Sequence, residues 1–115
     1  MDFPEAKMEL GLVKIHKSVI SSIASLAAME VEGVKKIGKN NVFGELLKGK
    51  PYRNIKVIID KNGEIKLNIP LIIKYGFNIP EVALQVQNNV RLALQNMVNL
   101  EAKEINIDIK GIERS

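Results

Sequence analysis

Two stretches of alternating residues, separated by a short polar turn, constrain the fold of this chain more than any other feature. In residues 55–59 and again in 65–73, every second residue is Ile, Leu or Val. Because side chains alternate between the faces of a strand, each stretch predicts a strand with one apolar face. The intervening Lys61-Asn62-Gly63 predicts a hairpin. A two-residue Asn-Gly turn would place Ile59 opposite a lysine, so we predict a three-residue loop with its glycine in the left-handed conformation, which pairs Ile59 with Ile65.

A second helix is predicted from residue 78 onward. Asn78 is a suitable N-cap, Pro80 suits the first turn, and Glu81 completes a capping box three residues after the cap. Apolar residues then recur at spacings of three and four, which predicts one buried helix face. They are Ile79, Val82, Ala83, Val86, Val90, Ala93, Leu94 and Met97.

Weaker patterns predict the remaining elements. A short strand is expected at Leu12–Ile15, followed by a helix that begins at the N-cap Ser18 and stops before Gly33. Val19, Ile20, Ile23, Leu26 and Ala27 would form its buried face, with the serines between them toward solvent. Residues 105–109 alternate and predict a last strand, and Pro70 places its strand at a sheet edge or marks a bulge.

The predicted order is therefore β-α-β-β-α-β. Two helices that cover one face of a small mixed sheet would bury all the apolar stripes, so we expect an α+β fold, a two-layer α/β sandwich. The uncovered sheet face would be polar apart from Ile58 and Ile72. At 115 residues the whole chain, 1–115, is expected to form a single domain, with residues 1–8 as a frayed N-terminus.

The composition narrows the classes of function. The absence of Cys excludes disulfides, thiolate catalysis and Cys-ligated metals, and it suits a reducing compartment. No apolar run reaches the 18 or so residues of a membrane span, and the N-terminus does not resemble a signal peptide. We therefore expect a soluble, cytoplasmic protein.

The positive charge is concentrated in one segment. Residues 35–53 contain six cations and one anion, a net charge of +5 against +4 for the whole chain, together with several Gly and Asn residues typical of a long loop. The cations are candidate anion-binding residues: Lys35, Lys36, Lys39, Lys48, Lys50 and Arg53. Nucleic-acid phosphates, an anionic membrane surface and plain solvation all remain open as interpretations of this loop.

Two further patterns do not predict catalysis. Residues 33–39 and 44–50 both fit GxxxxGK, but neither is followed by the Ser or Thr that binds magnesium in a phosphate-binding loop. His16 is the single histidine and has no recognisable nucleophile or metal-ligand pattern around it. We predict no enzymatic activity, no catalytic or metal-binding residue, and no cofactor.

Four segments in order resemble the alkaline shock protein family. They are Met29-Glu30-Val31-Glu32-Gly33-Val34, Lys74-Tyr75-Gly76, Val86-Gln87-Asn88-Asn89-Val90 and Ile105-Asn106-Ile107-Asp108-Ile109-Lys110-Gly111-Ile112. The resemblance covers about residues 10–112. It implies a small cytoplasmic protein of Gram-positive bacteria that is linked to alkaline or cell-envelope stress. It also implies a protein that is not an enzyme and that self-associates or attaches to the membrane through a partner.

These observations predict a non-catalytic adaptor or scaffold that forms a homo-oligomer and binds a membrane-anchored protein or an anionic membrane surface. Uncharged amides on the second helix suit an interface, so Gln87, Asn88 and Arg91 are candidate contact residues. Ile58 and Ile72 are the candidates for self-association through the sheet. The alternative is a small nucleic-acid-binding module that uses the basic loop 35–53.

Overall fold

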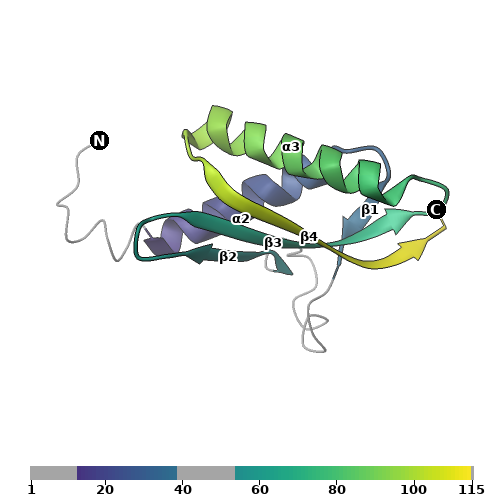
Figure 1. The fold of residues 1–115 in the computed structure, drawn as a ribbon, viewed down its shortest axis with the longest axis horizontal. Helices are drawn as coiled ribbons and strands as arrows, with labels where there is room; N and C mark the ends of the chain where they lie inside the picture. The colour runs from purple at the N-terminus through teal and green to yellow at the C-terminus, as the bar shows by residue number, and fades with distance from the viewer. Residues whose placement is uncertain (1–12, 39–53, 115) are drawn as a thin grey trace.

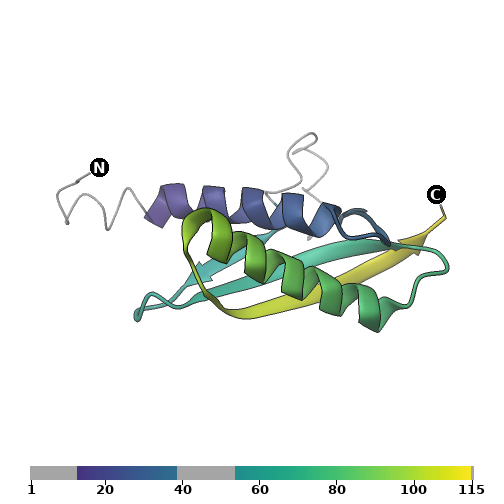
Figure 2. The ribbon, with the colours of Figure 1, turned by 90° about the horizontal axis from the view of Figure 1, so that it is seen from above.

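The computed structural model describes residues 13–38 and 54–114, which form two helices on one face of a four-stranded sheet. The elements are α2 (Val13–Met29), β1 (Val34–Ile37), β2 (Lys56–Ile59), β3 (Ile65–Lys74), α3 (Ile79–Val98) and β4 (Ala102–Glu113). Figure 1 shows the two layers from the side, and Figure 2 shows α2 and α3 lying next to each other above the strands. The expected α+β sandwich, with two helices on one face of a mixed sheet, is confirmed.

The central strand of the sheet is β3, because both of its edges are paired. On one edge β4 runs parallel to β3 along its full length, from Ile65 to Lys74. The other edge is shared: β2 pairs antiparallel with residues 65–68, and β1 pairs antiparallel with residues 71–73. Of the two alternatives predicted for Pro70, the sheet edge is therefore wrong, whereas a register shift does lie beside it, between Leu71 and Ile72. Pro70 lies between the two short partners, where its carbonyl accepts a bond from the Gly38 N–H at 2.8 Å, so its missing N–H interrupts no ladder.

The core lies between the helices and the sheet. The inward-facing row of β3 is buried, and it meets Val82, Val86, Val90 and Leu94 of α3, as predicted, whereas Met97, which was also predicted on this face, is 64% exposed. In α2 the buried face differs from the prediction, because Leu26 is 64% exposed whereas the small residues Ala24, Ala28, Ser21 and Ser25 face inward. Ser21 Oγ donates to the Ser18 carbonyl at 3.1 Å, so this serine is buried with its hydroxyl satisfied.

The N-terminal elements correct two sequence predictions. Residues 13–15 belong to α2 and do not form a strand, while Leu12 lies outside the described residues. Ser18 accordingly lies inside α2 and is not its N-cap. A strand that was not predicted, β1, forms after α2 instead, in residues that were expected to begin the basic loop. Over residues 13–38 and 54–114 the element order is thus α-β-β-β-α-β.

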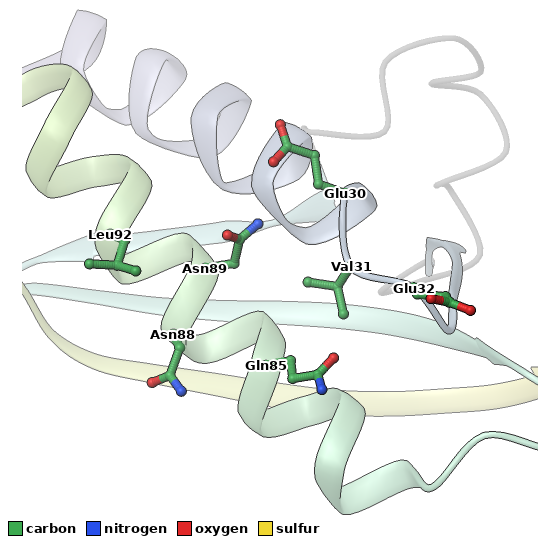
Figure 3. A pocket seen from close by; sticks show the side chains of 7 residues that line it. All are labelled: Glu30, Val31, Glu32, Gln85, Asn88, Asn89 and Leu92. Atoms are coloured by element: carbon green, nitrogen blue, oxygen red, sulfur yellow. The ribbon is translucent and has the colours of Figure 1, made fainter.

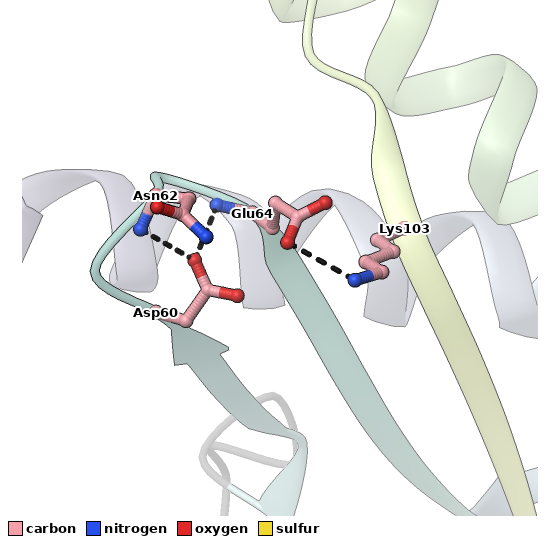
Figure 4. Close-up of polar contacts among 4 residues, drawn as sticks. All are labelled: Asp60, Asn62, Glu64 and Lys103. Carbon is pink, nitrogen blue, oxygen red and sulfur yellow. Dashed lines mark hydrogen bonds and ion pairs between the residues drawn. The ribbon is translucent and has the colours of Figure 1, made fainter.

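The hairpin between β2 and β3 forms as predicted. Ile59 pairs with Ile65, and Gly63 has a φ of +80°. Asp60 organises the turn, because its Oδ1 accepts bonds from the Asn62 N–H at 2.8 Å and the Glu64 N–H at 2.9 Å (Figure 4). Lys103 of β4 donates to Glu64 Oε1 at 3.0 Å and ties the turn to the start of that strand.

The contacts of Asp60 and Lys103 predict how the stability of the hairpin depends on pH. The bond from the Glu64 N–H lowers the pKa of Asp60, and the bond to Glu64 raises the pKa of Lys103. A lowered carboxyl pKa adds stability above the unfolded value of about 4, and that stability is lost as pH falls through the folded pKa. A raised lysine pKa adds stability below about 10.4, which is lost as pH rises through the folded pKa.

We therefore expect Asp60→Asn to lower Tm at pH 7 and the difference from wild type to shrink in acid. Thermal unfolding between pH 3 and pH 7 measures this. Asn62→Ala keeps the backbone N–H that Asp60 binds and is the matched control. An Asp60→Asn effect that stays constant down to pH 3 would contradict the role given to the Asp60 charge.

Candidate functional site

The basic residues predicted from sequence are only partly within the described structure. Lys35 and Lys36 lie in β1, where Lys36 Nζ is 3.6 Å from Glu113 Oε2 of β4. Lys39, Lys48, Lys50 and Arg53 lie outside the described residues, as does the GxxxxGK match at 44–50. The role of this segment in anion binding stays a prediction.

His16 lies within α2, whereas the predicted strand to Ile15 and helix from Ser18 would have put it between two elements. The first GxxxxGK match also has an unsuitable setting, because Gly33 follows a helix and leads into the strand β1, whereas a phosphate-binding loop follows a strand and opens a helix. Within 13–38 and 54–114, no group of three or more His, Cys, Asp or Glu side chains could hold a metal ion.

The two isoleucines predicted for self-association lie on the uncovered face of the sheet but are far apart. Ile58 is 37% exposed and pairs with Lys66, while Ile72 lies six residues further along β3 and is half-buried. At about 3.3 Å per residue they are separated by roughly 20 Å, so they do not form one continuous patch.

The amides of α3 divide into two groups. Gln87 Nε2 donates to the Ile105 carbonyl of β4 at 2.8 Å, and Asn89 Nδ2 donates to the Ala27 carbonyl of α2 at 2.6 Å. These two side chains therefore hold α3 against its neighbours within the fold. Asn88 and Arg91 are exposed. Asn88, unlike Gln87, lines a groove.

This groove, which we call the α2–α3 groove, has a volume of about 400 Å³ and runs between the end of α2 and the middle of α3. One wall is the turn after α2, and the other is a face of α3 (Figure 3). Its lining residues are Glu30, Val31, Glu32, Gln85, Asn88, Asn89 and Leu92. A second hollow of about 200 Å³ shares Glu32 and Gln85 with it and extends it past Phe77, Asn78, Glu81 and Val82.

The local structure of α3 and of the turn after α2 determines where the two walls of the α2–α3 groove lie. Residues 81, 85, 88 and 92 follow the i, i+4, i+7, i+11 spacing of a single helix face, which is exposed, while the adjacent Asn89 is the side chain that contacts α2. On the opposite wall, α2 ends at Met29 and the chain reverses through Gly33, which has a φ of +102°. An added Cβ at Gly33 would lie 2.8 Å from both Phe77 Cδ2 and Val82 Cγ2, so only glycine lets the turn approach α3 this closely.

Chemically, the groove combines carboxylates, amides and apolar groups. Leu92 is 59% exposed and Phe77 38% exposed, although both are large hydrophobic residues. Surfaces of this kind, with exposed apolar groups among amides, are typical of binding sites for other macromolecules. Helical spacing could have predicted the α3 wall from sequence, but no sequence signal places Glu30 and Glu32 beside it.

The fold and groove define a small α+β domain with an open groove on its helical layer. The comparison with protein families matches residues 5–114 to the alkaline shock protein 23 family, which is described as having a cell envelope-related function. The chain therefore belongs to the alkaline shock protein 23 family, and the relationship predicted from its sequence segments is confirmed.

Individual relatives agree with this membership. The chain is similar to the uncharacterized protein YqhY of Bacillus subtilis, with 39% identity over 110 residues that cover 90% of this chain and 78% of YqhY. It is 24% identical to the uncharacterized protein YloU of the same organism over 112 residues, which cover 94% of this chain and 93% of YloU. It is 23% identical to the uncharacterized protein Spy1535 of Streptococcus pyogenes over 103 residues, 90% of this chain and 80% of Spy1535. No solved structure gives a significant match.

Among the described residues, neither helix is long and apolar enough to cross a membrane.

Proposed function

We propose that the protein is a non-catalytic cytoplasmic adaptor of the cell envelope, which binds a partner protein in the α2–α3 groove and associates with further copies of itself. The observation that carries this proposal is that two of the segments by which the chain resembles its family, 29–34 and 86–90, meet at this groove.

The exposed members of these two segments support a role in binding. Val31, Val34, Val86 and Val90 are buried and serve the core. Glu30, Glu32 and Asn88 are exposed, so packing does not require a carboxylate or an amide at these positions. Side chains that the fold does not need, gathered around one groove, are expected to contact another molecule.

Site-specific photo-crosslinking tests the proposal in cells. A photoreactive residue at position 88 is expected to give adducts with another protein, and these should survive nuclease treatment. At position 58, on the uncovered sheet face, we expect adducts of twice the mass of the chain, which report self-association. Position 62, at the exposed hairpin tip, is the control and should give neither.

Two outcomes would count against this function. Adducts at position 88 that disappear with nuclease would favour the nucleic-acid alternative. Adducts of equal yield at positions 88 and 62 would show that the groove has no special role.

A further inference from the structure

We infer that the partner segment bound in the α2–α3 groove is basic, a short stretch that carries Lys or Arg side chains together with apolar ones. This inference rests on the proposed function and names the chemistry of its partner. The groove and its extension are lined by three carboxylates, Glu30, Glu32 and Glu81, and by no Lys or Arg, although the chain contains 17 of them.

Three carboxylates of the sheet have a cation in ion-pair contact, whereas the groove carboxylates, like Asp60, Glu101 and Glu104 among the described residues, do not. On the sheet, Glu64 pairs with Lys103, Asp108 with Lys110, and Glu113 with Lys36. In the part of the chain that the structure describes, none of the three groove carboxylates forms an ion pair. Their charge is therefore available to a ligand.

The position of Glu30 and Glu32 strengthens the negative potential. A helix carries a partial negative charge at its C-terminus, where Lys, Arg or His is the favourable neighbour. The last turn of α2 contains no basic residue, and Glu30 and Glu32 follow directly after its end at Met29. Two acids at the negative end of a helix oppose folding electrostatically, and a bound cationic group would relieve this repulsion.

The apolar lining adds a second requirement on the partner. Val31, in the turn after α2, and Leu92, on α3, also line the groove (Figure 3), and Phe77 lies in the extension. A purely charged ligand would leave Leu92 in water. An amphipathic segment, with Lys on one face and Leu on the other, would cover Leu92 with its apolar face. We therefore expect charge and apolar contact to act together.

Binding of three labelled 12-residue peptides to the purified full chain, followed by fluorescence anisotropy, tests the inference. One peptide is an amphipathic Lys/Leu sequence, the second replaces Lys with Glu, and the third replaces Leu with Ser. We expect the Lys/Leu peptide to bind at least about 10-fold more tightly than either of the others, and its affinity to fall with added salt.

Substitutions in the protein test whether the Lys/Leu peptide binds in the α2–α3 groove. Glu30→Gln combined with Glu32→Gln is expected to weaken the Lys/Leu peptide about 10-fold. The matched control, Glu64→Gln combined with Asp108→Asn, removes two carboxylates from the sheet and should change the affinity by less than about 2-fold. Glu30→Lys is expected to abolish binding while it raises Tm by about 2–6 °C, since it places a cation at the C-terminus of α2.

Three results would overturn the inference: equal affinity for the Lys and Glu peptides, no saturable binding of the Lys/Leu peptide, or equal losses in the groove and control variants. If position 88 still crosslinks to a protein in cells while any of these holds, the adaptor function stands and only the basic partner is wrong.

Discussion

Replacing Gly33 by alanine is expected to lower the free energy of unfolding by about 2–5 kcal/mol. The φ of +102° is strained for any residue with a Cβ, and the new methyl group would lie 2.8 Å from Phe77 and from Val82. Both neighbours would have to move, and with them the start of α3 and the groove extension. Urea denaturation of the wild type and the variant measures the loss.

Gly63 provides the matched control. Its φ of +80° is also positive, but an added Cβ there meets nothing within 4 Å. Gly63→Ala should therefore cost only the conformational part, about 1 kcal/mol. Equal losses at the two glycines would show that the close approach of the turn to α3 does not contribute to stability.

Asn89→Asp is expected to lower the free energy of unfolding by about 2–4 kcal/mol at pH 7. Asn89 Nδ2 donates to the Ala27 carbonyl at 2.6 Å, and aspartate replaces this donor with a negative charge that faces a carbonyl oxygen. The carbonyl lies in the last turn of α2, so the helix dipole adds to the repulsion. Urea denaturation again provides the measurement.

The pH dependence of this variant distinguishes repulsion from a general packing defect. The unfavourable contact raises the pKa of the introduced carboxyl in the folded state, so part of the loss should be recovered as pH falls and the carboxyl becomes protonated and able to donate. The neighbouring Asn88→Asp, at an exposed position, should stay within about 0.5 kcal/mol of wild type. A loss at Asn89→Asp that does not depend on pH would contradict the bond to Ala27.

Local signals explain which parts of the fold could be predicted from the sequence. The hairpin register follows from the alternation on both sides of Lys61-Asn62-Gly63. The start of α3 follows from Asn78, whose Oδ1 accepts the Glu81 N–H at 3.0 Å. In both cases the residues that determine the structure are neighbours in the chain.

The errors occur where short segments lack a clear period. The stretch 13–15 contains two apolar residues around a lysine, and so short a run does not distinguish strand from helix. In β1 the register shifts between Val34 and Lys36, so Val34 and Ile37 are both buried although they are three residues apart. A strand with such a bulge does not alternate, and its sequence pattern is typical of a loop.

The groove could not be predicted because its walls are joined only by the tertiary structure. The amides of α3 were recognised as a candidate interface, but the sequence does not show that Gln87 and Asn89 are used inside the fold. Nor does it show that Glu30 and Glu32 lie beside Asn88. That proximity depends on the antiparallel contact of β1 with β3 and on the close packing of Gly33 against Phe77.

The most direct test of the central claim is an NMR titration of the ¹⁵N-labelled protein with the Lys/Leu peptide. The account predicts that the largest amide shifts fall in residues 30–32 and 85–92, the two walls of the α2–α3 groove. Largest shifts in residues 104–110 of β4, on the sheet, would contradict it and place the binding surface on the opposite layer.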